Sequence, residues 1–226
     1  MAASAGALAL IPARGGSKGI AHKNLQLVGG IPLVSRCVLA ALNSQRITRV
    51  VVSTDDAGIE AAAVDAGAQV VRRPADISGD IASSESALLH ALSELEQREA
   101  LESTLVFLQC TSPFTSGHQI DRVLAALDQP ELNSSFAVRP WHGFLWRADG
   151  DGINHNPSLP RQRRQDLQPA YLETGAIYAM RTAPFRRIGS RFCAPWQPVV
   201  LPDSSPEIDT ADDLALCRSI SAINAS

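Results

Sequence analysis

The chain has few cysteines, few aromatic residues and no long apolar run. Its 4 cysteines include no C-x-x-C pair, which disfavours a disulfide framework and a cysteine-rich zinc site. No apolar stretch approaches the roughly 20 residues of a membrane helix, and the apolar N-terminus lacks the basic residues of a signal peptide. The net charge of −3 offers no broad basic surface for nucleic acid. We therefore expect a cytoplasmic protein that binds neither membranes nor nucleic acid.

Length and composition indicate a single domain over residues 1–226. The chain is 45% hydrophobic and 19% charged, as is usual for a soluble globular protein. Its length suits one hydrophobic core, and no repeat or low-complexity linker divides it. Because the net charge is slightly negative, an anionic ligand would have to be held by a local cluster of cations.

Short apolar runs alternate with segments of helical periodicity. Strands are expected over residues 7–12, 49–53, 69–72, 104–109, 135–138, 171–178 and 198–201, with helices near residues 32–42, 57–66, 84–95 and 117–127 and from residue 210. This alternation is typical of an α/β fold with a mainly parallel sheet. Residues 140–170 are rich in Pro, Gly, Arg and Gln and lack periodicity, which predicts a long functional loop or an excursion that packs on a partner subunit.

A glycine-rich basic loop, IPARGGSKGIAHKN, follows the first expected strand. It leaves the carboxyl end of that strand, which is where α/β sheets bind ligands. Glycines bring backbone N–H groups close to an anion, and clustered cations suit a triphosphate. The candidate phosphate-binding residues are Arg14, Gly15, Gly16, Ser17, Lys18, Lys23 and Asn24. The spacing matches neither G-x-x-x-x-G-K-[ST] nor G-x-G-x-x-G, so the alternative is a solvated turn with unrelated charges.

This loop resembles the opening motif of the acylneuraminate cytidylyltransferases, and the resemblance extends over nearly the whole chain. The other segments that carry it are RRP and the following residues (72–84), LQCTSPF (108–114), RRQDLQPAYLETGAIY (163–178) and EIDT (207–210). The resemblance implies a Rossmann-like nucleotidyltransferase fold, a three-layer sandwich around a mainly parallel mixed sheet. It also implies a homodimer, with residues 140–170 as a protruding dimerisation excursion that reaches toward the partner's site.

The resemblance assigns roles on the nucleotide side of the site. Arg73 and Ser84 take the places that contact cytosine, although without it a surface charge and a helix cap would be the simpler interpretations. Asp209, with Glu207, takes the place of a D-I-D pair that holds Mg²⁺ in the family, so Glu207 stands where the family has aspartate and is one methylene longer. We expect these two side chains to share one face of a strand, because side chains at i and i+2 point the same way.

The resemblance also assigns a sugar site. Gln109 would lie beside the sugar, Arg164 would contact its carboxylate, and Tyr178 would line the pocket. The family usually has Asn immediately before the glycine of GAIY, whereas this chain has Thr174. Threonine keeps a hydroxyl but lacks the amide's donors, so the identity of the sugar stays open.

The implied activity is Mg²⁺-dependent transfer of CMP from CTP to the anomeric hydroxyl of a nonulosonic (sialic-type) acid, with release of pyrophosphate. Arg14, Lys23 and Asp209 are the catalytic candidates. One alternative is a sister enzyme for pseudaminic, legionaminic, Kdn or Kdo-type acids. Another is a non-catalytic nucleotide-sugar binding homologue, which the presence of all three candidates disfavours.

Overall fold

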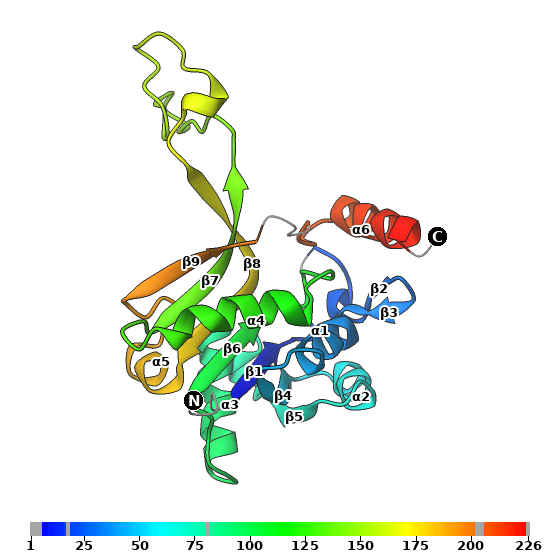
Figure 1. The fold of residues 1–226 in the computed structure, drawn as a ribbon. Helices are drawn as coiled ribbons and strands as arrows, with labels where there is room; N and C mark the ends of the chain where they lie inside the picture. Colours follow the sequence, from blue (N-terminus) through cyan, green and yellow to red (C-terminus); the bar gives the residue numbers. More distant parts are fainter. Residues whose placement is uncertain (1–5, 17–18, 80–81, 202–205, 225–226) are drawn as a thin grey trace.

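A seven-stranded mixed sheet forms the centre of the computed structural model, which describes residues 6–16, 19–79, 82–201 and 206–224 (Figure 1). Its strands are β1 (Ala7–Pro12), β4 (Ile47–Thr54), β5 (Gln69–Arg72), β6 (Thr104–Leu108), β7 (Ser134–Trp141), β8 (Ala170–Arg181) and β9 (Trp196–Val200). The order is β5-β4-β1-β6-β8-β7-β9. The first four of these are mutually parallel, β8 is antiparallel to both neighbours, and β9 is parallel to β7. The mainly parallel mixed sheet is therefore confirmed.

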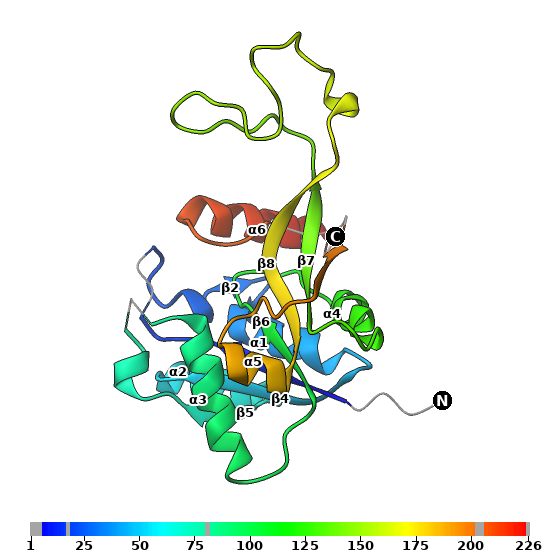
Figure 2. The same ribbon diagram turned by 90° about the vertical axis from the view of Figure 1, so that its left-hand side faces the viewer.

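Helices cover both faces of this sheet and make three layers (Figures 1 and 2). They are α1 (Leu33–Leu42), α2 (Ala57–Asp65), α3 (Ser84–Glu96), α4 (Gly117–Ala125), α5 (Thr182–Ile188) and α6 (Ala211–Asn224). Alternate residues of β1 point to opposite faces: Ile11 belongs to a core shared with α1, α2, α4 and α6, whereas Leu10 belongs to a core shared with α3 and α5. Helices therefore cover both faces of β1, as is expected for a strand whose residues are all apolar. No helix in the described ranges is both long and apolar enough to cross a membrane.

Helix starts follow the capping residues in the sequence. Asp56, rather than Asp55, caps α2 by accepting a 2.9 Å hydrogen bond from the Ile59 N–H. Ser83, rather than Ser84, caps α3 by accepting from the Ser86 N–H at 3.1 Å. Ser84 is thus the first residue of the helix, and its side chain is not used as the cap.

The expectation of a strand at Glu207 and Asp209 was wrong. Residues 206–209 form no strand and are held by one backbone bond in which the Ile208 N–H donates to the Thr111 carbonyl at 2.8 Å. The expected helix over 117–127 ends as an α-helix at Ala125 and continues as a 3₁₀ turn, Ala126–Asp128. The sequence did not predict α5, the short hairpin of β2 (Leu27–Val28) and β3 (Ile31–Pro32), or the 3₁₀ turns at Lys23–Leu25, Ala75–Ile77 and Arg164–Asp166.

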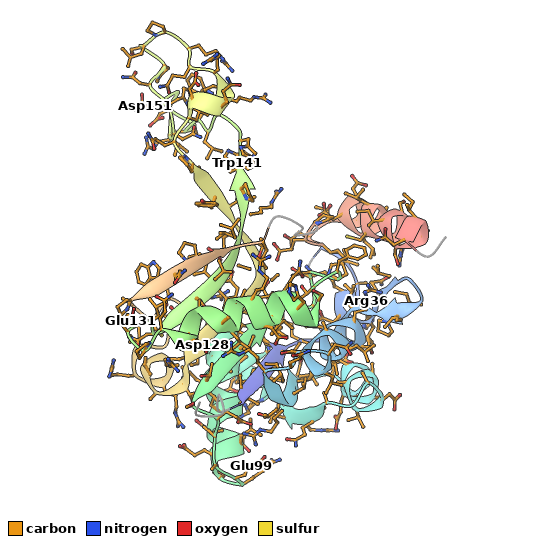
Figure 3. The ribbon with its side chains drawn as sticks, viewed as in Figure 1. Arg36, Glu99, Asp128, Glu131, Trp141 and Asp151 are labelled. Carbon is orange, nitrogen blue, oxygen red and sulfur yellow. The ribbon has the colours of Figure 1, made fainter. Side chains whose placement is uncertain are left out.

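The long β7–β8 ladder continues into an excursion that projects away from the three layers (Figures 1 and 2). Trp141 pairs with Ala170 at its base, so the excursion itself covers residues 142–169, slightly less than predicted. Trp141 marks that base and Asp151 lies far out along it (Figure 3). The aperiodic sequence predicted a long functional loop or an excursion, and the family resemblance implied a protruding one; its role as a dimerisation element remains a prediction.

Candidate functional site

A cleft of about 440 Å³ opens at the carboxyl ends of β1, β5 and β6. Of the residues predicted for the nucleotide and the metal, its lining includes Arg14, Lys23, Asn24, Arg73, Ser84 and Asp209 but not Gly15, Gly16 or Glu207. Gly19 and Gln109, the second of which was predicted for the sugar, also line it. A second hollow, of about 460 Å³, lies on the excursion and is lined mainly by apolar side chains and prolines. The first cleft is the candidate site because it gathers cations and a carboxylate where parallel strands end.

Contacts with other segments fix the path of the glycine-rich loop. The Asn24 amide donates to the Arg14 carbonyl at 2.9 Å, and the Gly15 N–H donates to Asp55 at 2.9 Å. A Cβ on Gly19 would lie 2.8 Å from the Asp209 carbonyl oxygen, whereas a Cβ on Gly16 would meet nothing within 4 Å. Close approach therefore requires glycine at position 19. Ser17 and Lys18 lie outside the described residues.

Lys23 joins this loop to the segment that carries the predicted metal ligands. Its ammonium donates to the Ile208 carbonyl at 3.0 Å and to Asp209 at 3.3 Å. The Lys23 side chain is 18% exposed, while that of Asp209 is 71% exposed. An ammonium group has three N–H donors, so these two contacts leave one for an anion in the cleft.

Arg73 is a buried cation and not the surface charge that sequence logic alone favoured. Its guanidinium donates to the Ser53 carbonyl at 2.8 Å and to the Ser53 hydroxyl at 3.3 Å. Burial lowers the pKa of Arg73, the charge of Asp55 acts to raise it and that of Arg14 to lower it further. The guanidinium keeps N–H donors beyond those that Ser53 accepts, on a side chain that lines the cleft beside Ser84.

The two predicted metal ligands differ in their surroundings. The Asp209 carboxylate is exposed in the cleft, next to Lys23. Glu207 is half-buried and accepts a 3.0 Å hydrogen bond from the Thr111 hydroxyl. Burial raises the pKa of Glu207, and the charges of Asp209 and Glu173 add to the effect. The described residues contain no cluster of three or more His, Cys, Asp or Glu suited to a metal. Mg²⁺ bound with a nucleotide needs only one or two carboxylates, so Asp209 fits this ion.

Comparison with known proteins gives the family. Residues 8–221 match the sequence model of the family described as cytidylyltransferase. The chain belongs to the cytidylyltransferase family. The N-acylneuraminate cytidylyltransferase of Oncorhynchus mykiss is 34% identical over 186 residues, which are 79% of this chain and 42% of that protein. The CMP-N,N'-diacetyllegionaminic acid synthase of Legionella pneumophila is 31% identical over 233 residues, covering 96% of this chain and 97% of that protein.

Solved structures confirm the nucleotidyltransferase fold. A CMP:2-keto-3-deoxy-manno-octonic acid synthetase complexed with CTP superposes with a TM-score of 0.73, at 18% identity, over 97% of this chain and 99% of that one. The 2-C-methyl-D-erythritol 4-phosphate cytidylyltransferase of Thermus thermophilus gives a TM-score of 0.62, at 18% identity, over 95% and 98%. This chain spans less than half the length of several curated family members, such as the one from Oncorhynchus mykiss at 42%.

The structure separates the predicted sugar residues. Gln109 lines the cleft, and its side-chain oxygen lies 3.4 Å from the Thr111 hydroxyl oxygen. Tyr178 is buried behind the cleft, stacks on Phe107 at 5.4 Å between ring centroids and donates its hydroxyl to Glu173. Burial raises the pKa of Tyr178, and its bond to Glu173 adds to the effect. Phe107 lines the cleft, so Tyr178 supports a wall of the site.

Thr174 and Arg164 do not line the cleft of this chain. The Thr174 hydroxyl donates to the Ala137 carbonyl across the β7–β8 ladder at 3.1 Å. Arg164 lies in a short 3₁₀ turn of the excursion, Arg164–Asp166, and is exposed. A sugar contact by either residue remains a prediction.

Sequence reasoning missed several residues around the cleft. Phe107, Cys110 and Thr111 belong to its lining, and the ion pair of Glu85 with Arg191 lies behind it. A signal existed for the first three, because they flank Gln109 at the end of a buried strand. No local signal marked Arg191, which is more than 100 residues from Glu85.

Proposed function

We propose that this chain transfers CMP from CTP to the anomeric hydroxyl of a nonulosonic acid and releases pyrophosphate. The observation that carries the proposal is the cleft itself, which is lined by Arg14, Lys23 and Arg73 and by the exposed carboxylate of Asp209, which is paired with Lys23. Arg14 and Lys23 suit a triphosphate, Arg73 suits the acceptors of cytosine, and a carboxylate in the same cleft suits the metal ion of the nucleotide. The family match and its curated members support the same chemistry.

The cations would position the triphosphate and stabilise the charge that develops as pyrophosphate leaves. Arg14 and the remaining N–H of Lys23 would bind phosphate oxygens. Arg73 would bind the cytosine, whose O2 and N3 accept hydrogen bonds, together with Ser84. Gly15, Gly16, Ser17, Lys18 and Asn24 complete the proposed phosphate loop.

Asp209 would hold Mg²⁺ by its exposed carboxylate. Glu207 accepts the Thr111 hydroxyl on one carboxylate oxygen, and its other oxygen would be the one to join the ion. When bound, Mg²⁺ would neutralise phosphate charge and lower the pKa of a coordinated hydroxyl. That acidity matters because none of the described residues lining the cleft is a histidine, the usual general base.

We propose a homodimer in which the excursion of one chain approaches the site of the other. Arg164 is exposed on the excursion and absent from its own cleft, so a contact with the sugar carboxylate would have to cross between chains. The excursion also exposes large apolar side chains: Leu159 is 62% exposed, Ile153 53% and Trp146 51%. Such side chains are common at the centres of interfaces. The four free, buried cysteines are compatible with the cytoplasmic location we propose.

A legionaminic-type acid is the second candidate substrate. One observation favours it. The match with this chain includes 97% of the diacetyllegionaminic acid synthase but 42% of the Oncorhynchus mykiss protein. Pseudaminic, Kdn and Kdo-type acids follow as further sister substrates, and a non-catalytic nucleotide-sugar binding protein is the remaining alternative.

The test is pyrophosphate release from CTP and Mg²⁺ with a panel of eight- and nine-carbon keto-sugar acids, with and without EDTA. Turnover with one nine-carbon acid that EDTA abolishes would support the proposal and name the substrate. CTP binding without turnover of any acid would favour the non-catalytic alternative. Turnover that is insensitive to EDTA would contradict the role proposed for Asp209.

A further inference from the structure

A cation that belongs to none of the predicted motifs lies directly behind the cleft. The guanidinium of Arg191, in the loop after α5, is 4.8 Å from the ring centroid of Phe107 and 4.8 Å from that of Tyr178. Its Nε donates to Glu85 at 2.7 Å. The side chains of this ion pair are only 18% and 19% exposed. Arg191 is therefore held by two aromatic faces and one carboxylate, largely away from solvent.

This arrangement differs from an ordinary surface ion pair. Burial by itself lowers the pKa of Arg191, but the hydrogen bonds and charges of Glu85 and, after it, Tyr178 together outweigh burial, so the pKa is raised. The same bond lowers the pKa of Glu85 against the effect of its burial. Each charge thus depends on the other, and the planar guanidinium adds cation–π contacts that an ammonium on a flexible stem would not reproduce.

The contacts of Arg191 lead to both halves of the proposed site. Glu85 follows Ser84, the predicted cytosine contact, in the first turn of α3. Tyr178 is the predicted sugar contact on β8, and Phe107 stacks on it at an interplanar angle of 17° while lining the cleft. Because Glu173 accepts the Tyr178 hydroxyl, the network runs from α3 to the base of the excursion.

We propose that Arg191 is a positioning residue that sets the nucleotide wall and the sugar wall of the cleft relative to each other. This inference rests on the proposed function. Arg191 acts through Glu85 on the α3 terminus and through the two rings on the opposite wall, and it does not itself contact the substrates. Its loss should therefore weaken the binding of both substrates more than it slows the chemical step, because the catalytic cations remain in place.

The experiment compares wild type, Arg191→Met, Arg191→Lys and the control Arg186→Met. Arg186 also pairs with a glutamate of α3, at 2.6 Å from Glu96, but at the far end of the helix and away from the cleft. We expect Arg191→Met to raise the KM for CTP and for the sugar acid by about tenfold each, with kcat within about threefold. Arg191→Lys should have the folded stability of wild type, but its two KM values should lie between those of wild type and Arg191→Met. Arg186→Met should leave all three constants unchanged.

Two results would overturn the inference while wild type is active. One is unchanged KM values in Arg191→Met. The other is full recovery of the wild-type KM values in the double variant Glu85→Met/Arg191→Met, because charge balance alone would then be the role of Arg191. Wild type that neither binds CTP in calorimetry nor turns over any acid would instead contradict the proposed function, and the inference would fall with it.

Discussion

Replacing Lys23 with methionine tests the central assignment of the site. Methionine keeps an aliphatic stem and removes the ammonium, which lies 3.0 Å from the Ile208 carbonyl and 3.3 Å from Asp209. Two effects follow and can be measured separately. The glycine-rich loop loses its connection to residues 206–209, and the cleft loses a cation that we place on the triphosphate.

The two effects differ in size. A hydrogen bond to a carbonyl contributes about 1 kcal/mol to stability. The ion pair contributes about 0.5 kcal/mol or less, because the Asp209 side chain is 71% exposed and solvent screens it. The free energy of unfolding should therefore fall by about 1–2 kcal/mol. A donor placed on transition-state charge contributes about 3–4 kcal/mol, so kcat/KM should fall by about 10²–10³-fold.

The assay is pyrophosphate release at saturating Mg²⁺, with urea unfolding of the same preparations. Arg122→Met is the matched control, because Arg122 also donates to a backbone carbonyl, that of Val200 at 3.0 Å, but does not line the cleft. It should lose a similar hydrogen bond and keep its activity. A loss of less than about tenfold in Lys23→Met, or an equal loss in Arg122→Met, would refute the phosphate role of Lys23.

Three further variants test the surroundings of Lys23. Gly19→Ala should cost about 1–3 kcal/mol of stability and weaken CTP binding in calorimetry, because its Cβ would lie 2.8 Å from the Asp209 carbonyl, whereas Gly16→Ala, whose Cβ would meet nothing within 4 Å, should leave the stability unchanged. Arg73→Lys should raise the Kd for CTP about tenfold, because lysine cannot reproduce the planar fork bonded to Ser53; an unchanged Kd would contradict the cytosine contact. Glu207→Gln should unfold at higher urea than wild type at about pH 8 but not at about pH 4. Because the pKa of Glu207 is raised, the folded state binds the proton of this carboxyl more tightly than the unfolded chain does. The free energy of unfolding therefore falls as the pH rises from the ordinary glutamate pKa through the pKa of Glu207 in the folded state. Equal curves at both pH values would contradict this.

Much of the fold was predictable because its signals are local. The run of residues 7–12 is apolar throughout, and it became β1, covered on both faces. Candidate caps at Asp56 and Ser83 became the starts of α2 and α3, since a cap needs only the backbone N–H groups of the next turn. The glycine-rich loop was recognisable for the same reason: its donors and cations lie within one short segment.

The remaining features depend on contacts between distant segments. Polar and apolar residues alternate over residues 206–209 as they would in a strand. These residues pair with no strand of the sheet, so the alternation alone gave a wrong prediction. An arginine such as Arg73 or Arg191 is usually a surface charge. Here Arg73 is bonded to Ser53 and Arg191 to Glu85, away from solvent, and neither partner is close in sequence. The local sequence also could not show that the Thr174 side chain does not line the cleft, because the direction of this side chain depends on the pairing of β7 with β8.

The chain's departures from the usual family motifs at positions 174 and 207 meet around one glycine. Gly175 has a positive φ of 69°, and a Cβ there would lie 2.6 Å from a carboxylate oxygen of Glu207. The pairing of β7 with β8 shifts register between Phe136 and Val138, just where Thr174 donates to the carbonyl of Ala137. The absence of a side chain at position 175 is therefore coupled to glutamate at 207, whereas the hydroxyl of the adjoining Thr174 is bonded to β7. Restoring the usual asparagine at 174 alone would leave the Glu207 carboxylate against Gly175 and the Ala137 carbonyl without its hydroxyl donor. A substitution at position 174 would therefore act first on the pairing of β7 with β8, and one at position 207 on the space beside Gly175.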